Sequence, residues 1–313
     1  MTTAAPTASS SEPRRVAVVG PTASGKSGVA FAAAIELGDA ELISVDAMQV
    51  YRGMDIGTAK PPAEERAAVR HHLIDLVDHA EEFTVAQFKR AHDEALDDIA
   101  ARGRRAVLVG GTGLYHRIVI DGIELPGDWP ELRRRFEEEA ADLGAEALHG
   151  RLAELDPAAA ARMERTNTRR VVRALEVCVG SGRPFSSFGP GLDTYPPSPV
   201  PQIGLRWPRD VLGRRVEQRV HQMLEDGLLD EVRALRGSGL SRTARQALGY
   251  KELLDHLDGG ASLDEAVETI IRRTRQFAVR QLRWFGRDPR VRWIDITHDP
   301  VEEARAIVVD ALS

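Results

Sequence analysis

A short segment near the start of the chain has the residue types and the spacing of a phosphate-binding loop. It reads GPTASGKS, fits the pattern G-x-x-x-x-G-K-[ST], and stands between a short apolar run and a helical pattern. The glycines let successive backbone N–H groups point at phosphate oxygens, Lys26 adds a positive charge, and Ser27 can bind Mg²⁺. We therefore expect a di- or triphosphate site made of Gly20, Pro21, Thr22, Ala23, Ser24, Gly25, Lys26 and Ser27.

Two further polar side chains follow apolar runs that are typical of strands. Asp46 ends the run ELISVD at 41–46, and Thr112 follows the run AVLVGG at 106–111. The carboxyl ends of parallel strands meet at one edge of a sheet, where α/β proteins bind ligands, so we expect both side chains beside the phosphate site. There Asp46 could accept a proton from a second substrate, or it could serve only a turn. The Gly-rich segment around Thr112 is likewise either a ligand contact or a simple tight turn.

Arginines in the second half of the chain form two groups with helical spacing. Arg214, Arg215 and Arg219 lie at 209–224, and the last two share a face because they are four residues apart. Such arginines most often face solvent, but a P-loop transferase needs a second cation on its diphosphate.

The second group lies at 269–293, which carries eight Arg and one Asp. Its apolar face contains Ile271, Ala278, Leu282 and Phe285. The opposite face, here called the basic stripe, has almost no acid, which favours contact with a phosphate backbone over a solvated basic face. The basic stripe consists of Arg273, Gln276, Arg280, Arg283 and Arg287, and a weaker cluster consists of Arg162, Arg165, Arg169, Arg170 and Arg173.

These residues need a parallel α/β sheet with helices on both faces to bring them together. Strand-like runs at 15–19, 41–46, 71–77, 106–111, 202–207 and 291–296 alternate with helical patterns such as 83–103. We expect a disordered tail at 1–14, a P-loop NTPase-like core at 15–123 and 201–313 with C-terminal helices, and a mostly helical insertion at 124–200.

The net charge of the 313-residue chain, −6, would argue against a nucleic-acid partner, but this value is an average. Residues 1–200 hold 23 basic and 30 acidic side chains, whereas residues 201–313 hold 19 and 18. No apolar run is long enough for a membrane-spanning helix, and residues 1–13 lack the apolar core of a signal peptide. The single Cys178 cannot form an internal disulfide and fits a small core residue, so we expect a cytoplasmic protein without a membrane partner.

From the residues alone, three kinds of function remain open. The protein could be a small-molecule kinase with ATP on the loop, a transferase that uses a diphosphate donor on a nucleic acid, or a nucleotide-binding regulatory module. The basic stripe and the helical insertion favour the transferase. A metal site at 71–79 is not favoured, because neighbouring side chains of an extended segment point to opposite faces.

Taken together, the motifs resemble those of bacterial tRNA dimethylallyltransferases. The chain contains, in order, GPTASGKS, ELISVDAMQVYRGMDIGTAKP, HHLID, VGGTGLY, RALEV, QALGYKE and TRQFAVRQLRWF. The resemblance implies transfer of a dimethylallyl group from dimethylallyl diphosphate to N6 of the adenine just 3′ of the tRNA anticodon. The alternative within the resemblance is an isopentenyltransferase acting on free adenosine phosphates, which needs neither the insertion nor the basic stripe.

The resemblance also implies roles for the residues of the phosphate site. Asp46 is expected as the general base and Thr112 as a hydroxyl contact near the reacting centre. Lys26, Mg²⁺ bound through Ser27, and Arg219 are expected to hold the diphosphate. Although a P-loop invites an ATP-binding label, the family's donor is an allylic diphosphate, so we expect no obligatory ATP hydrolysis. Mg²⁺ is the expected cofactor, and a monomer is expected.

For the tRNA, the resemblance points to the anticodon stem-loop, with the insertion on the stem and the target base out of its stack. The chain departs from the family pattern at Val279, Arg283 and Gly286, where a basic residue, a small polar residue and Arg are common. The expected contacts are Asp46, Ala47, Met48, Gln49, Arg133, Arg169, Arg170, Val171, Val172, Arg173, Gln246, Ala247, Leu248, Gly249, Tyr250, Lys251, Arg280, Gln281, Leu282, Arg283, Trp284, Phe285 and Gly286.

Overall fold

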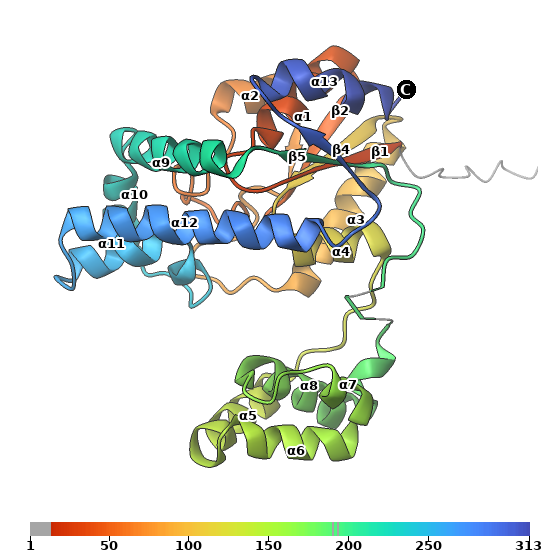
Figure 1. The fold of residues 1–313 in the computed structure, drawn as a ribbon, viewed down its shortest axis with the longest axis vertical. Helices are drawn as coiled ribbons and strands as arrows, with labels where there is room; N and C mark the ends of the chain where they lie inside the picture. Colours follow the sequence, from red (N-terminus) through yellow and green to blue (C-terminus); the bar gives the residue numbers. More distant parts are fainter. Residues whose placement is uncertain (1–13, 190, 193) are drawn as a thin grey trace, which may run out of the picture. The chain divides into compact units, whose positions relative to one another are not determined.

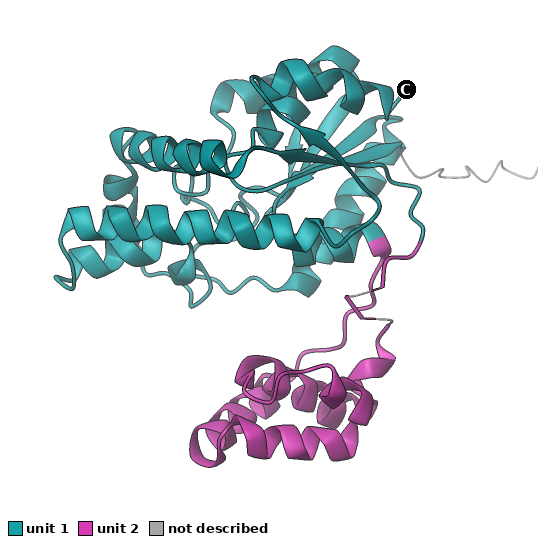
Figure 2. Ribbon diagram, in the orientation of Figure 1, with its two compact units in different colours: residues 1–120, 197–313 teal, residues 121–196 magenta. Residues whose placement is uncertain are grey.

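The computed structural model describes residues 14–189, 191–192 and 194–313, which divide into two compact units (Figures 1 and 2). Unit 1 contains the residues up to 120 together with 197–313, and unit 2 contains 121–196. The insertion expected at 124–200 therefore differs from unit 2 by a few residues at each end. The expected tail at 1–14 lies outside the described residues except for Arg14, whose Nη1 donates to the backbone oxygen of Ser313 at 2.6 Å.

Unit 1 is built on a parallel sheet, which confirms the predicted α/β class. The strand order is β3-β2-β4-β1-β5-β6, so β1 lies between β4 and β5. Every neighbouring pair in this sheet is parallel, so the carboxyl ends of the strands meet at one edge. The strands are β1 (Arg15–Val19), β2 (Ala40–Val45), β3 (His71–His72), β4 (Arg105–Gly110), β5 (Gln202–Arg206) and β6 (Val291–Asp295).

Helices cover both faces of this sheet, as the near-continuous apolar character of its strands requires (Figure 1). Alternate residues of β1 enter different cores: Val16 and Val18 pack with α1 and α13, whereas Ala17 and Val19 belong to the core that includes α3 and α12. The helices of unit 1 are α1 (Lys26–Leu37), α2 (Ala63–Ala68), α3 (Val85–Ala101), α4 (Gly113–Asp121), α9 (Arg209–Glu225), α10 (Leu228–Ser238), α11 (Tyr250–Leu257), α12 (Leu263–Phe285) and α13 (Pro300–Asp310).

The strand expected at 71–77 is much shorter than its sequence pattern indicates. Only His71 and His72 pair with β2. Leu73 and Asp75 then adopt positive φ angles of 65° and 56°, a left-handed conformation that ends an extended strand. The prediction of a longer strand here was wrong because the pattern of apolar residues does not encode this turn.

Unit 2 has a helical core of its own. It contains α5 (Pro130–Leu143), α6 (Ala145–Leu155), α7 (Pro157–Ala161), α8 (Thr168–Ser181) and a 3₁₀ turn at Phe185–Ser187. Phe136, Leu152 and Leu175 are fully buried in this core, and Cys178 packs beside them as a small apolar residue. Across the described part of the chain, no helix is long and apolar enough to cross a membrane.

Candidate active site

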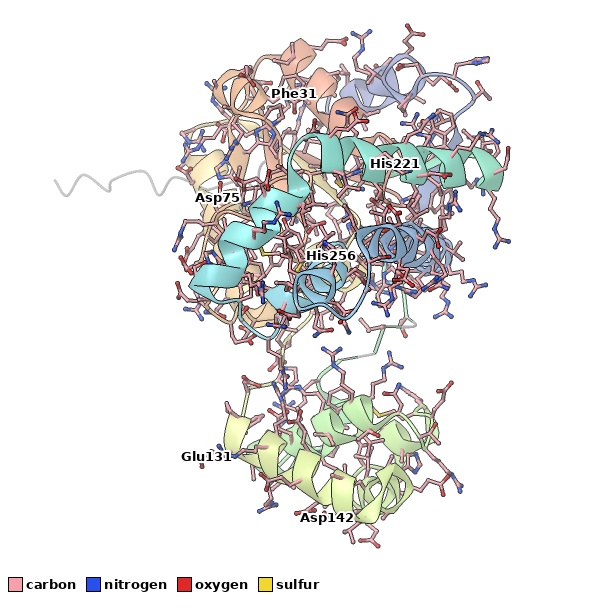
Figure 3. All side chains as sticks on the ribbon, turned by 90° about the vertical axis from the view of Figure 1, so that its left-hand side faces the viewer. Phe31, Asp75, Glu131, Asp142, His221 and His256 are labelled. Atoms are coloured by element: carbon pink, nitrogen blue, oxygen red, sulfur yellow. The ribbon has the colours of Figure 1, made fainter. Side chains whose placement is uncertain are left out.

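A cavity of about 570 Å³ lies at the carboxyl edge of the sheet in unit 1. The loop after β1, the segments after β2 and β4, and residues of α9 and α12 line it. Figure 3 shows unit 1 from the side on which α9 and α11 lie; His221 is labelled on α9 and His256 on α11. Residues far apart in the sequence meet in this cavity, so we expect the active site to lie there.

The loop at 20–27 has the backbone of an anion-binding site. Ala23 and Gly25 adopt positive φ angles of 63° and 91°, and α1 begins at Lys26. The backbone N–H groups of Gly25, Lys26 and Ser27 find no acceptor among the described residues. A helix N-terminus with unpaired N–H groups attracts negative charge, so this loop is suited to phosphate oxygens.

Two side chains hold this loop through its carbonyl groups. Trp207 donates from Nε1 to the oxygen of Ser24 at 3.0 Å, and Arg215 donates from Nε to the oxygen of Ala23 at 2.9 Å. The guanidinium of Arg215 also lies over the Trp207 ring, 4.4 Å from its centroid. Arg215 therefore supports the loop, while Arg214 is exposed and pairs with Asp210. Sequence reasoning missed Trp207, although its place directly after β5 was a usable signal.

Lys26 and Arg219 are cations of the same cavity. The Lys26 Nζ donates to the oxygen of Pro21 at 3.3 Å. Burial, together with the nearby positive charge of Arg219, lowers the pKa of Lys26 to about 8, and Asp46 acts in the opposite direction. Burial also lowers the pKa of the Arg219 guanidinium, which has no hydrogen-bond partner in the described part of the molecule. Two cations that no carboxylate pairs directly favour the binding of an anion.

Asp46 and Thr112 stand at the ends of β2 and β4 and line the same cavity. Asp46 accepts from the backbone N of Met48 at 2.8 Å through Oδ1, whereas Oδ2 has no partner among the described residues. The Thr112 hydroxyl oxygen accepts from the backbone N of Ala47 at 3.2 Å, so its own proton remains free for a ligand. Asp46 thus forms a turn with one oxygen and offers the other to the cavity.

Gln49, which is expected at the tRNA, has hydrogen-bond partners within the protein. Its Oε1 accepts from the Ser44 hydroxyl at 2.7 Å, and its Nε2 donates to the backbone oxygens of Thr58 and Ala59, both at 3.1 Å. These bonds fix the cavity wall at 57–59. Its amide oxygen and both of its N–H donors have partners in this arrangement.

The buried Lys60 and the half-buried Glu231 hold the same wall, and sequence reasoning missed both. Lys60 donates to the backbone oxygen of Tyr51 at 2.5 Å and to carboxylate oxygens of Asp55 and Asp75 at 2.6 Å. Figure 3 labels Asp75, the second of these two aspartates. Glu231 accepts from the backbone N of Ile56 at 2.8 Å and from the Tyr250 hydroxyl at 2.5 Å. No motif in the sequence marks these residues: the partners of Lys60 lie within 15 positions of it, whereas Glu231 lies 175 positions from Ile56.

Several residues expected at the tRNA form the walls of the cavity. Tyr250 and Ala247 are buried, and Gln281 is 6% exposed. The Gln281 side chain accepts from the backbone N of Thr22 at 2.8 Å and donates to the oxygen of Gly111 at 2.9 Å. Of the remaining expected contacts, Met48, Leu248, Leu282 and Trp284 are half-buried, Gly249 and Phe285 are buried, and Gln246, Lys251, Arg280, Arg283 and Gly286 are exposed.

In unit 2, the arginines expected at the tRNA fall into two sets. Arg133 and Arg173 donate to the fully buried Glu176 at 2.9 and 2.7 Å. Burial opposes the ionisation of Glu176, but Arg133, the backbone of Trp129 and Arg173 outweigh it and lower the pKa of this carboxyl. Arg169 and Arg170 are exposed and have no acidic partner among the residues described, whereas Val171 and Val172 lie in the core.

A phosphate-binding loop, two cations, a free carboxylate oxygen and a free hydroxyl thus surround one cavity at the edge of a parallel sheet. Fold and site define a P-loop α/β protein whose cavity has room for a phosphate compound and a second substrate. The chain belongs to the IPP transferase family, since the family model with that description matches residues 49–288. The loop and Asp46 precede the matched range.

Relatives of known name cover nearly the whole chain. A protein of Pseudarthrobacter chlorophenolicus named tRNA dimethylallyltransferase is 49% identical over 296 residues, or 94% of this chain and 97% of the relative. One of the same name from Kocuria rhizophila is 52% identical over 282 residues, or 90% and 88% of the two chains.

Solved structures agree with these relatives. The full-length tRNA isopentenylpyrophosphate transferase of Bacillus halodurans is 42% identical with a TM-score of 0.70, covering 96% of this chain and 97% of that chain. A eukaryotic dimethylallyltransferase described as acting on tRNA is 26% identical with a TM-score of 0.78, covering 95% and 78%.

Proposed function

We propose that the protein transfers a dimethylallyl group from dimethylallyl diphosphate to N6 of the adenine beside the anticodon of a tRNA. One observation supports this proposal most directly. The same cavity is lined by the phosphate-binding loop and by Asp46 and Thr112, whose Oδ2 and hydroxyl proton have no partner among the described residues. The relatives named tRNA dimethylallyltransferase support this reaction. The alternative that the protein is a small-molecule kinase has no comparable support.

The donor diphosphate would lie on the loop. The unpaired N–H groups of Gly25, Lys26 and Ser27 would bind its oxygens, and the side chains of Lys26 and Arg219 would neutralise its charge. The Ser27 hydroxyl lines the cavity and has no partner among the described residues, and oxygen is the ligand that Mg²⁺ prefers. Ser27 would therefore hold Mg²⁺, which when bound stabilises negative charge on the diphosphate.

In the transfer itself, the bond between the allylic carbon and the diphosphate oxygen breaks and a bond from that carbon to N6 forms. The adenine amino group is a poor nucleophile because its lone pair is delocalised into the ring. Asp46 Oδ2 would take the proton that N6 loses, the Thr112 hydroxyl would donate a hydrogen bond near the reacting centre, and the diphosphate would leave with its charge held by Lys26 and Arg219. Apolar residues of the lining, such as Val220 and Ile270, would exclude water from the allyl group.

Exposed arginines would bind the RNA backbone. Arg280 and Arg283 of the basic stripe, and Arg169 and Arg170 of unit 2, are exposed and without acidic partners in the part of the chain described. Phosphate contacts of this kind position a nucleic acid, and the target base would leave its stack to reach the cavity. We propose a cytoplasmic monomer, and sedimentation of the purified full chain tests the monomer.

One assay separates the candidates. The full chain is given labelled dimethylallyl diphosphate with either tRNA or AMP, and the products are digested to nucleosides. We expect labelled N6-dimethylallyladenosine from tRNA and none from AMP. Label on AMP alone would assign the enzyme to free adenosine phosphates, and phosphate transfer from ATP to a small acceptor would make it a kinase.

Arg219 gives a direct test of the donor side. Replacing Arg219 with Ala removes a half-buried cation that would bond to the diphosphate, so KM for dimethylallyl diphosphate should rise about 10- to 100-fold. Steady-state kinetics measure this change, and Arg214→Ala on the same helix is the control because Arg214 is exposed. Unchanged donor kinetics in the Arg219 variant would remove this residue from the site.

A further inference from the structure

A single polar side chain lies on the buried face of α12. The other buried residues of this fully described helix, namely Ala266, Ile270, Ile271, Ala278 and Phe285, are apolar. Gln281 stands among them, yet its hydrogen bonds leave the helix and reach two separate loops. A buried amide of this kind is costly unless it is satisfied, so its two partners are specific features of the fold.

Both partners of Gln281 are main-chain groups of the cavity. The first is the N–H of Thr22 in the phosphate-binding loop, and the second is the oxygen of Gly111 in the turn after β4. A Cβ on Gly111 would lie 2.3 Å from the Gln281 Nε2, so glycine permits this close approach. One helical turn later, Trp284 packs against Gly113 in the same way, since a Cβ there would lie 2.2 Å from its ring.

The two bridged loops carry the two sides of the proposed reaction. The loop after β1 would hold the diphosphate, and the turn after β4 carries Thr112, which bonds to Ala47 beside Asp46. Gln281 also occupies the Thr22 N–H, so the phosphate is left to the N–H groups of Gly25 to Ser27. A side chain that joins the two loops sets the distance between the leaving group and the base, and small errors in such distances cost large factors in rate.

We propose that Gln281 is a positioning residue that holds the phosphate-binding loop against the 110–113 turn. This role differs from the tRNA contact that the sequence resemblance implies for the same residue. The proposal rests on the proposed function, because it assumes that the loop holds a diphosphate donor. It predicts that loss of the amide changes donor binding and the rate of transfer while tRNA binding stays the same.

The experiment compares Gln281→Met, which keeps the length of the side chain and loses both hydrogen bonds, with Gln218→Met on the exposed face of α9. Titration calorimetry of the full chain with Mg²⁺ and inorganic pyrophosphate gives Kd, and kinetics give kcat and both KM values. For Gln281→Met we expect Kd for pyrophosphate and KM for dimethylallyl diphosphate to rise about tenfold, kcat to fall, and KM for tRNA to change less than about twofold. Gln218→Met should match the wild type.

A second variant keeps the proposal testable if Gln281→Met does not fold. Gly111→Ala places a methyl group against the Gln281 amide without altering Gln281, and it should give the same split between donor and tRNA. Unchanged pyrophosphate Kd with a raised KM for tRNA would overturn the proposal and make Gln281 an RNA contact. If the wild type fails to bind pyrophosphate at all, the donor site itself is wrong and both proposals fall together.

Discussion

At the scale of single residues, the two carboxylate oxygens of Asp46 have different surroundings. Oδ1 accepts from the Met48 backbone and forms the turn after β2, while Oδ2 is free in the cavity. The sequence left both roles open as alternatives, and the structure shows the turn contact through Oδ1 while Oδ2 has no partner among the described residues. A variant that removes only the second role is therefore more informative than alanine.

Asp46→Asn supplies that variant. The Asn oxygen still accepts from Met48, but the side chain can no longer take a proton, so kcat should fall by about 10²- to 10⁴-fold. Pyrophosphate binding, measured by calorimetry, should stay within about twofold. A transfer rate near that of the wild type would exclude Asp46 as the general base.

The Lys26 ammonium group makes donor binding depend on pH. Burial and Arg219 lower its pKa from 10.5 to about 8, and a bound diphosphate favours the charged form. Below pH 8 the cation is present; above pH 8 binding must take up a proton, so Kd for pyrophosphate should rise by up to about tenfold per pH unit. Lys26→Arg keeps its charge and records the ionisation of pyrophosphate alone. Identical pH profiles for the two proteins would show that Lys26 does not titrate there.

At the scale of elements, α12 presents two different faces. Its buried face contributes Gln281 to the cavity, and its exposed face carries Gln276, Arg280 and Arg283 of the basic stripe, whose last member Arg287 lies beyond the helix. The stripe is shorter than the sequence predicts, because Arg273 donates to the buried Glu252 at 2.5 Å, whereas Arg280 and Arg283 lack acidic partners among the residues described.

Arg280→Ala combined with Arg283→Ala tests the exposed face. If each arginine contacts one phosphate, tRNA affinity should fall and the slope of log K against log salt should decrease by about 2. Filter binding at several salt concentrations measures the slope. The control is Arg233→Ala with Arg236→Ala on α10, where each arginine already pairs with an aspartate. An unaltered slope would mean that the stripe faces solvent.

In unit 2, Arg133 has a contact that should contribute to stability. Arg133 and Arg173 share the buried Glu176, so Arg133→Ala leaves that carboxylate with fewer partners and should lower the free energy of unfolding by about 1.5–3 kcal/mol. Urea unfolding measures the loss, and the exposed neighbour Arg134→Ala should change it by less than about 0.5 kcal/mol. Unchanged stability with weaker tRNA binding would return Arg133 to the RNA surface.

At the scale of the whole molecule, the sequence predicts what depends on short-range pattern. Apolar runs located β1, β4 and β5, and the loop motif located a segment that lines the cavity. Contacts between distant residues left no such signal: Gln281 meets Thr22 across 259 positions, and Glu231 meets Ile56 across 175. Exposure also escaped prediction, because a range such as 169–173 contains both exposed arginines and core valines.

The net charge of −6 is likewise a property of the whole chain that hides local differences. Many arginines are neutralised where they stand, as Arg102 is by Glu41 and Asp98, or Arg133 by Glu176. Exposed arginines without an acidic partner among the described residues include Arg280 and Arg283 on α12 and Arg169 and Arg170 at the start of α8. Association with tRNA should therefore follow these surfaces and the salt concentration rather than the isoelectric point.

Cys178 is the only cysteine in the sequence, and it lies in the core of unit 2, where its sulfur accepts from the backbone N of Phe185 at 3.3 Å. Burial raises the pKa of this thiol, so little of the reactive thiolate is present in the folded protein. The thiol should therefore react slowly with thiol reagents. We therefore expect the rate of labelling to report how often the core of unit 2 opens to solvent. The single buried thiol thus serves as an intrinsic probe of the opening of unit 2.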